Sequence, residues 1–165
     1  MDYGMISQIE KARRYAEEPG RIKFNNLTVL FTGDHDIYTV SLNDTQWHCS
    51  CSGFENHGIC PHVMTLERVL KPMLRVRPLP YAQGQNVVSD VEKAHRYAGE
   101  RDRIKFTTFD ATFHGNNSDH RLTYDNGQWH CDSVSFKLRG VSSHTIAMER
   151  ILKGMIVPTL AHAPA

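Results

Sequence analysis

The chain of 165 residues contains no apolar run long enough to span a bilayer, and residues 1–14 lack the hydrophobic core of a secretory signal peptide. There is also almost no excess of charge of one sign, because 19 Lys and Arg against 18 Asp and Glu leave a formal net charge of +1. The lack of a long apolar run excludes a membrane-spanning helix. The near-zero net charge gives no indication of nucleic-acid binding. We expect a cytoplasmic protein of one or two small folded domains.

The sequence patterns of common enzymes are missing as well. There is no P-loop, no Rossmann glycine pattern, no GxSxG and no HExxH, and the carboxylates are scattered rather than paired. Thiol chemistry at Cys49, Cys51 or Cys131 is the remaining catalytic candidate, but an isolated cysteine is more often inert than reactive. The sequence therefore predicts no enzymatic activity, no catalytic residue and no small-molecule substrate.

Cysteines are few, yet three of the four are clustered. Cys49, Cys51 and Cys60 lie within a dozen residues and are followed by His62, which gives the pattern CxC…CxH. Thiolates and imidazole are ligands that zinc prefers, and four of them complete a tetrahedron with no position left open for a substrate. The pattern predicts one structural zinc ion per chain. His48 and His57 remain competing candidates for the fourth ligand.

The spacing of these residues has a physical rationale. Residues i and i+2 of a strand point to the same side, so Cys49 and Cys51 present both sulfurs to one ion. Pro61 is favoured at the first position of a helix, and the apolar spacing after it is helical. We expect a strand end and a helix start, joined by a loop over residues 52–59, to hold the ion between them.

The CxC…CxH pattern, with a strand before it and a helix after it, resembles the SWIM-type zinc finger over about residues 46–73. This resemblance implies that Cys49, Cys51, Cys60 and His62 are the four zinc ligands. It also implies the roles proposed for that family, which are DNA binding and protein interaction. The resemblance extends to bacterial proteins that carry two SWIM-like repeats in tandem, in which the second repeat is degenerate.

An internal repeat organises the chain. At a constant offset, 131 − 49 = 82 residues, an ungapped match runs from about residue 7 to residue 73 and from residue 89 to residue 155. The segment Arg-Ile-Lys-Phe at residues 21–24 recurs at 103–106, and Gln-Trp-His-Cys at 46–49 recurs at 128–131. The absence of gaps predicts one fold for both copies.

The copies differ at the metal ligands. The second copy keeps Cys131 and His144 but has Ser133 and Ser142 where the first copy has cysteines. Neutral hydroxyls are poor zinc ligands, so we interpret this second site as vestigial. Compensation for the lost metal is expected, with Ser142 or Ser143 capping the following helix and with apolar side chains filling the emptied site, namely Val134, Phe136 and Val141.

Each copy is expected to form a helix, a three-stranded antiparallel meander and a second helix, which is an α+β fold. The first helices are expected at residues 6–18 and 88–100, and the first strands at residues 22–32 and 104–114. The predicted domains are a zinc-binding repeat at residues 1–73, a linker at residues 74–86, a degenerate repeat at residues 87–157 and a tail at residues 158–165.

Two function classes follow from these features. The leading hypothesis is a non-catalytic zinc-binding interaction module with a protein partner, and a zinc or redox sensor is a weaker one. The alternative is nucleic-acid binding, mainly of DNA, through cations gathered on the first copy. Interleaved glutamates favour a solvated face instead. The candidate contacts are Arg13, Arg14, Arg21, Lys23, Arg68, Lys71, Arg75 and Arg77.

Overall fold

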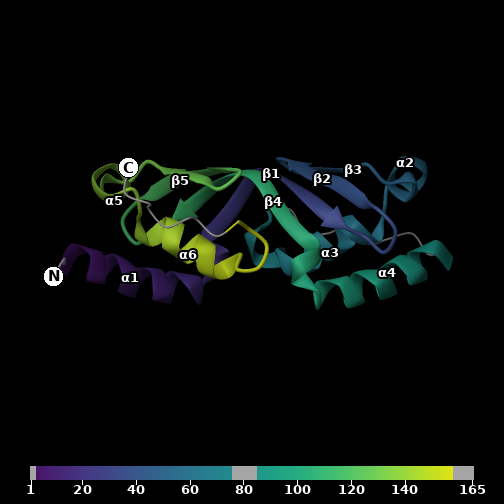
Figure 1. Cartoon of the computed structure of the whole chain (residues 1–165), viewed down its shortest axis with the longest axis horizontal. Helices are drawn as coiled ribbons and strands as arrows, with labels where there is room; N and C mark the ends of the chain where they lie inside the picture. The colour runs from purple at the N-terminus through teal and green to yellow at the C-terminus, as the bar shows by residue number, and fades with distance from the viewer. Residues whose placement is uncertain (1–2, 76–84, 158–165) are drawn as a thin grey trace.

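The computed structural model describes residues 3–75, here called the first half, and residues 85–157, the second half (Figure 1). The first half contains α1 (Tyr3–Ala16), η1 (Pro19–Arg21), β1 (Ile22–Thr32), β2 (Ile37–Asn43), β3 (Gln46–Cys49), α2 (Ser52–His57), α3 (Pro61–Val69) and η2 (Lys71–Met73). The second half contains α4 (Gln85–Ala98), η3 (Arg101–Arg103), β4 (Ile104–His114), β5 (Asp119–Asp125), β6 (Gln128–Cys131), α5 (Val134–Arg139) and α6 (Ser143–Ile151).

Apart from η2, which has no counterpart among the described residues of the second half, the two halves use the same elements at the same places. Each element of the second half begins 82 positions after its counterpart, as in 104 − 22 = 82 for the long strands β4 and β1. The predicted α+β class and the bounds of both long strands are confirmed. Most of the predicted linker, residues 76–84, and the tail, residues 158–165, lie outside the described residues.

The segment between the second and third cysteines was predicted as a loop, which is wrong, because it contains the short helix α2. The sulfur of Cys51 accepts a hydrogen bond from the backbone N–H of Phe54 and so caps the start of α2. Gly58, with φ of 71°, ends it in the left-handed conformation that glycine adopts readily. Local capping at both ends therefore makes a helix where the composition indicated a loop.

All six strands form one antiparallel sheet in the order β3-β2-β1-β4-β5-β6, so β1 and β4 join the halves at its centre. In this pairing Ile22 faces Phe113, Leu27 faces Phe109 and Phe31 faces Ile104. Because 113 − 82 = 31 and 104 − 82 = 22, each end of β1 faces the counterpart of its other end, while Leu27 faces its own counterpart, Phe109. The register thus has two-fold symmetry.

One face of the sheet is covered by helices, and these helices cross between the halves. In Figure 1 the purple α1 lies beside the yellow α6, and the teal α4 lies beside α3. The core beneath them consists of buried side chains that alternate along β1 and β4, including Phe24, Val29, Phe106 and Phe113. The opening helix of each half therefore covers the other half. Among the described residues, no helix has the length and apolar character needed to cross a membrane.

Candidate metal centre

The four predicted zinc ligands come together. The ligand atoms of Cys49, Cys51, Cys60 and His62 all lie within 4.8 Å of one another, and all four residues are buried. The Sγ of Cys49 is 3.7 Å from the Nδ1 of His62. A zinc ion with bonds of about 2.0–2.3 Å keeps its tetrahedral ligands roughly 3.5–3.8 Å apart, so the donor set fits one zinc ion.

Secondary structure places each ligand. Cys49 ends β3, and Cys51 and Cys60 are the N-cap residues of α2 and α3. The backbone N–H of Val63 donates to the Sγ of Cys60 at 3.4 Å, as that of Phe54 does to Cys51. Backbone donors at a helix start favour a thiolate, so the caps also prepare the sulfurs for a metal.

Electrostatics in the cluster favour one thiolate, at Cys49, among the three cysteines. A hydrogen bond from Cys60, together with one from His62, lowers the pKa of the Cys49 thiol to about 4, although burial opposes this shift. The same bond to Cys49 and burial raise the pKa of Cys60, and burial raises the pKa of Cys51. One thiolate is thus stabilised by its neighbours, and a bound zinc ion would displace the protons of the other two cysteines.

Aromatic rings fix the orientation of the histidine ligand. The ring of His62 lies 4.5 Å from Tyr38 and 4.9 Å from Phe31, centroid to centroid. Tyr97 stacks on it at 6.2 Å with an interplanar angle of 12°. Tyr97 belongs to α4, so the second half supplies part of the wall of this centre. Sequence reasoning missed these contacts, because nothing local links residue 97 to residue 62.

A charged network holds Tyr97 in place. Asp34, in the turn between β1 and β2, accepts a hydrogen bond from Arg96 at 2.6 Å, and Arg103 Nη2 lies 3.3 Å from its carboxylate. The hydrogen bond from Arg96 lowers the pKa of Asp34. The Arg103 guanidinium also lies 4.6 Å from the centroid of the Tyr97 ring.

The competing histidines are outside the cluster. His48 and His57 are both exposed, and the ring of His48 contacts Phe54 instead. The described ligand set therefore matches His62 as the fourth member, as predicted.

The corresponding residues of the second half also come together, but with hydrogen bonds in place of metal ligands. The Sγ of Cys131 is 3.4 Å from the Oγ of Ser133 and 3.7 Å from the Nδ1 of His144. Ser142 forms a capping box with Thr145, in which each side chain accepts the other's backbone N–H. The predicted capping role of Ser142 is confirmed.

His144 is buried among rings and carries no charge at neutral pH. Burial, with smaller effects from His120 and Lys11, lowers the pKa of His144 to about 4. His120 replaces Tyr38 at the equivalent position, since 120 − 82 = 38, and its ring lies 4.4 Å from that of His144. Tyr15 of α1 stacks on the other side at 5.9 Å. The second half thus keeps the ring packing around the histidine without the ligand set.

Of the three side chains predicted to fill the emptied site, two are packed in the structure and one is exposed. Val141 is buried and Phe136 packs against the core, but Val134 is 71% exposed. The prediction for Val134 is wrong, because it is the first residue of α5 and points to solvent when Ser133 caps that helix.

The predicted basic residues lie on separate elements of the first half. Arg13 and Arg14 lie on α1, which packs against α6, whereas Arg68 lies on α3 near His95 of α4. Others are held by nearby groups: Arg21 by Glu18 and the carbonyl of His114, Lys23 by the carbonyl of Pro72, and Arg75 by Asn25. Lys71 is exposed on η2, and Arg77 lies outside the described residues.

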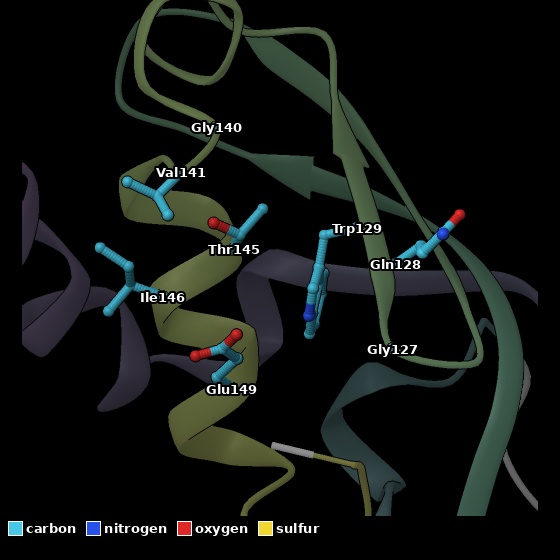
Figure 2. A pocket seen from close by; sticks show the side chains of 8 residues that line it. All are labelled: Gly127, Gln128, Trp129, Gly140, Val141, Thr145, Ile146 and Glu149. Atoms are coloured by element: carbon cyan, nitrogen blue, oxygen red, sulfur yellow. The ribbon is translucent and has the colours of Figure 1, made fainter. Parts of the chain in front are cut away.

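The second half also contains a pocket, which lies between β6 and α6 (Figure 2). It has a volume of about 320 Å³ and is lined by Trp129, Val141, Thr145, Ile146, Glu149 and three further residues. The indole Nε1 of Trp129 is buried and has no hydrogen-bond partner in the described part of the chain. Nothing in the sequence indicated this pocket.

Comparison with known proteins agrees with the geometry of the centre. The family model of the SWIM zinc finger matches residues 38–71, which include the strand, the two short helices and all four ligands. The comparisons with curated proteins and with solved structures found no match. Residues 38–71 therefore carry a SWIM zinc finger whose Cys and His cluster fits one structural zinc ion.

Proposed function

We propose that the chain is a non-catalytic zinc-binding interaction module whose partner is a protein. The observation that carries this proposal is the ligand cluster: four buried protein ligands lie together, which is the number that a tetrahedral zinc ion binds, so they would leave no position for a substrate or an activated water. Zinc then stabilises the fold that presents a surface, and it takes no part in chemistry.

We further propose that the two halves are copies of one unit, of which the first retains zinc. The constant offset of 82 residues between elements and the symmetric β1 to β4 register support this duplication. The free, buried cysteines support a reducing compartment such as the cytoplasm. Burial of the cluster also disfavours the alternative of a redox sensor, which needs an accessible thiolate.

Nucleic-acid binding is the less favoured function. The candidate cations lie on different helices, and several are held by carbonyl or carboxylate groups. A surface that neutralises many phosphates needs them free and close together. The protein hypothesis does not have this requirement.

Three measurements on the intact protein test the proposal. We expect elemental analysis to find one zinc per chain, and affinity capture from the native host to retain the same partner on the wild type and on Cys131→Ser. Cys60→Ser should lose both the zinc and the partner. Mobility-shift titrations with single- and double-stranded DNA and RNA should show no micromolar binding. Salt-dependent nucleic-acid binding without a captured protein would favour the alternative, and a zinc-free wild type would overturn the proposal.

A further inference from the structure

A basic pocket lies where α3 of the first half meets α4 and η3 of the second half. It has a volume of about 520 Å³, which is within the range of ligand-binding pockets. Two of its sides are the helices α3 and α4, which pack against each other as Figure 1 shows. The lining residues are Arg68, Val69, His95, Ala98, Gly99 and Arg101. The pocket is therefore built by both halves, at a place separate from the zinc cluster.

The side chains that line the pocket carry positive charge. Arg68 and Arg101 supply two guanidinium groups, and among the described residues no Asp or Glu lines the space. The adjacent carboxylate of Glu100 pairs with Arg103 instead, with 3.4 Å between its Oε1 and the arginine Nε. Helix C-termini nearby favour cations, but even three of them, at about half an elementary charge each, offset less than two guanidinium charges. An anion would neutralise the charge that remains.

Both guanidinium groups are positioned by neighbours that are not carboxylates. Arg101 Nη2 donates to the carbonyl of Ile151, the last residue of α6, at 2.6 Å, and Arg68 Nη1 lies 3.4 Å from Nδ1 of His95. Neither arginine belongs to the arginine–carboxylate pairs found in the described part of the chain. A guanidinium has more N–H donors than these single contacts use. When Nδ1 of His95 accepts from Arg68, the ring proton is on Nε2, so His95 is also a donor.

Gly99 leaves space in the pocket that the backbone does not require to be empty. A Cβ at this position would meet only the carbonyl oxygen of Arg96, at an ordinary contact distance of 3.5 Å. Its φ is not positive, so a residue with a side chain could adopt the same backbone conformation. The fold therefore does not explain the glycine, whereas an occupant of the pocket would.

The equivalent place in the other pair of helices, α1 and α6, contains a carboxylate. The constant offset of 82 residues places Arg13, Glu17, Pro19 and Arg150 at the positions of His95, Gly99, Arg101 and Arg68. Two guanidinium groups are present at both places, but Glu17 lowers the side-chain charge from +2 to 2 − 1 = +1. A lining without a carboxylate is thus a property of the pocket at α3 and α4 and not of the repeated unit.

We infer that this pocket binds a phosphate monoester group. Such a group carries a charge of about −1.5 to −2 at pH 7 and has three acceptor oxygens, which match donors on three separate elements. Arg68 of α3 and Arg101 of η3 bind its oxygens through charge-assisted hydrogen bonds, and His95 of α4 donates to the third. A phosphate diester, as in a nucleic-acid backbone, has one charge and matches less well. The inference goes beyond the proposed function and does not depend on it.

Titration of the full zinc-loaded chain with methyl phosphate tests the inference. The ionic strength is held constant, because added salt alone screens exposed charges. In ¹⁵N-correlated spectra the backbone N–H of Gly99 and the Nε–H of Arg101 report the pocket, and we expect both signals to shift saturably. Dimethyl phosphate, the matched diester, should bind at least about tenfold more weakly, as expected for a lost charge-assisted hydrogen bond.

A phosphoserine peptide identifies the source of the phosphate group. Tighter binding of acetyl-Ala-phosphoserine-Ala-amide than of methyl phosphate would support a phosphorylated protein segment as the ligand. Equal affinities would support a free phosphate ester, since the pocket would then contact only the phosphate group. Both results retain the inferred chemistry of the site.

Variants separate the pocket from the fold. Arg68→Gln should weaken methyl phosphate at least about tenfold, whereas Arg150→Gln, the same change at the equivalent position, should leave its affinity unchanged. Gly99→Glu introduces the carboxylate found at the equivalent position and should abolish binding, and Gly99→Gln adds a side chain of the same size without the charge and should weaken binding less. Zinc content and the remaining amide signals report whether each variant is folded. Unmoved pocket signals in the wild type, equal affinities for the monoester and the diester, or equal losses in Arg68→Gln and Arg150→Gln would overturn the inference.

Discussion

The first half holds its strand-to-helix junction with three thiols and an imidazole, and the second half holds the same junction with hydrogen bonds and ring packing. Cys49 and His62 are separated by the same 3.7 Å as Cys131 and His144. Where the first half has Cys51 and Cys60, the second half has the hydroxyls of Ser133 and Ser142, which cap α5 and α6. The junction thus depends on capped helix starts, and a metal is one of two ways to fasten them.

Removing a ligand should have the largest effect. Cys60→Ser is expected to abolish stoichiometric zinc binding and to lower the melting temperature by more than about 10 °C, since structural zinc contributes on the order of 10 kcal/mol of apparent binding energy. Elemental analysis and thermal denaturation measure both. The matched variant Cys131→Ser should keep one zinc per chain. If this variant also lost its zinc, the metal site would not be confined to the first half.

Restoring the ligands should convert the second junction into the first. The double substitution Ser133→Cys and Ser142→Cys places thiols beside Cys131 and His144, whose spacing already matches the metal centre. We expect zinc content to rise from one to two per chain. Ser133→Cys alone completes only three ligands and serves as the control. A content that stays at one in the double variant would show that ring packing around His144 excludes the ion.

The crossed helices predict unequal effects of two similar truncations. Tyr97→Ala and Tyr15→Ala each empty a buried site beside a histidine ring, so each should destabilise the fold by about 3 kcal/mol in urea denaturation. Only Tyr97→Ala should also speed the transfer of zinc to a competing chelator. Equal transfer rates for the two variants would mean that α4 does not support the metal centre.

The last effect is confined to acid. The pKa of His144 is lowered to about 4 in the folded chain, against about 6.5 when unfolded, so the unfolded state binds this proton first as pH falls. Stability from this group is present above pH 6.5 and declines by roughly 3 kcal/mol down to pH 4. Urea titrations of His144→Gln should lack this part of the decline. Zinc loss in acid affects the wild type and the variant alike, so the difference between their free energies of unfolding isolates the contribution of His144. If both free energies fell in parallel with pH, the prediction would be contradicted.

The sequence predicted what depends on short spacing. The ligands Cys49, Cys51, Cys60 and His62 could be identified because strand and helix periodicity brings them to one point, and the capping by Ser142 followed from its place before a helical run. The pairing of β1 with β4 could not be predicted, because an alternating apolar pattern suits an edge strand and a central strand equally. The crossing of α1 and α4 depends on that pairing, so it was missed too.

The symmetric register of β1 and β4 bears on how two different sites can share one chain. A chain of half this length would leave the same strand edge unpaired, and the symmetric register would let two copies pair at that edge as a two-fold dimer. In such a dimer every substitution occurs twice, so the metal is kept in both subunits or lost from both. Covalent linkage of the two halves would remove that constraint. One half could keep its metal ligands while the other half changed, and every molecule would still contain one half of each kind.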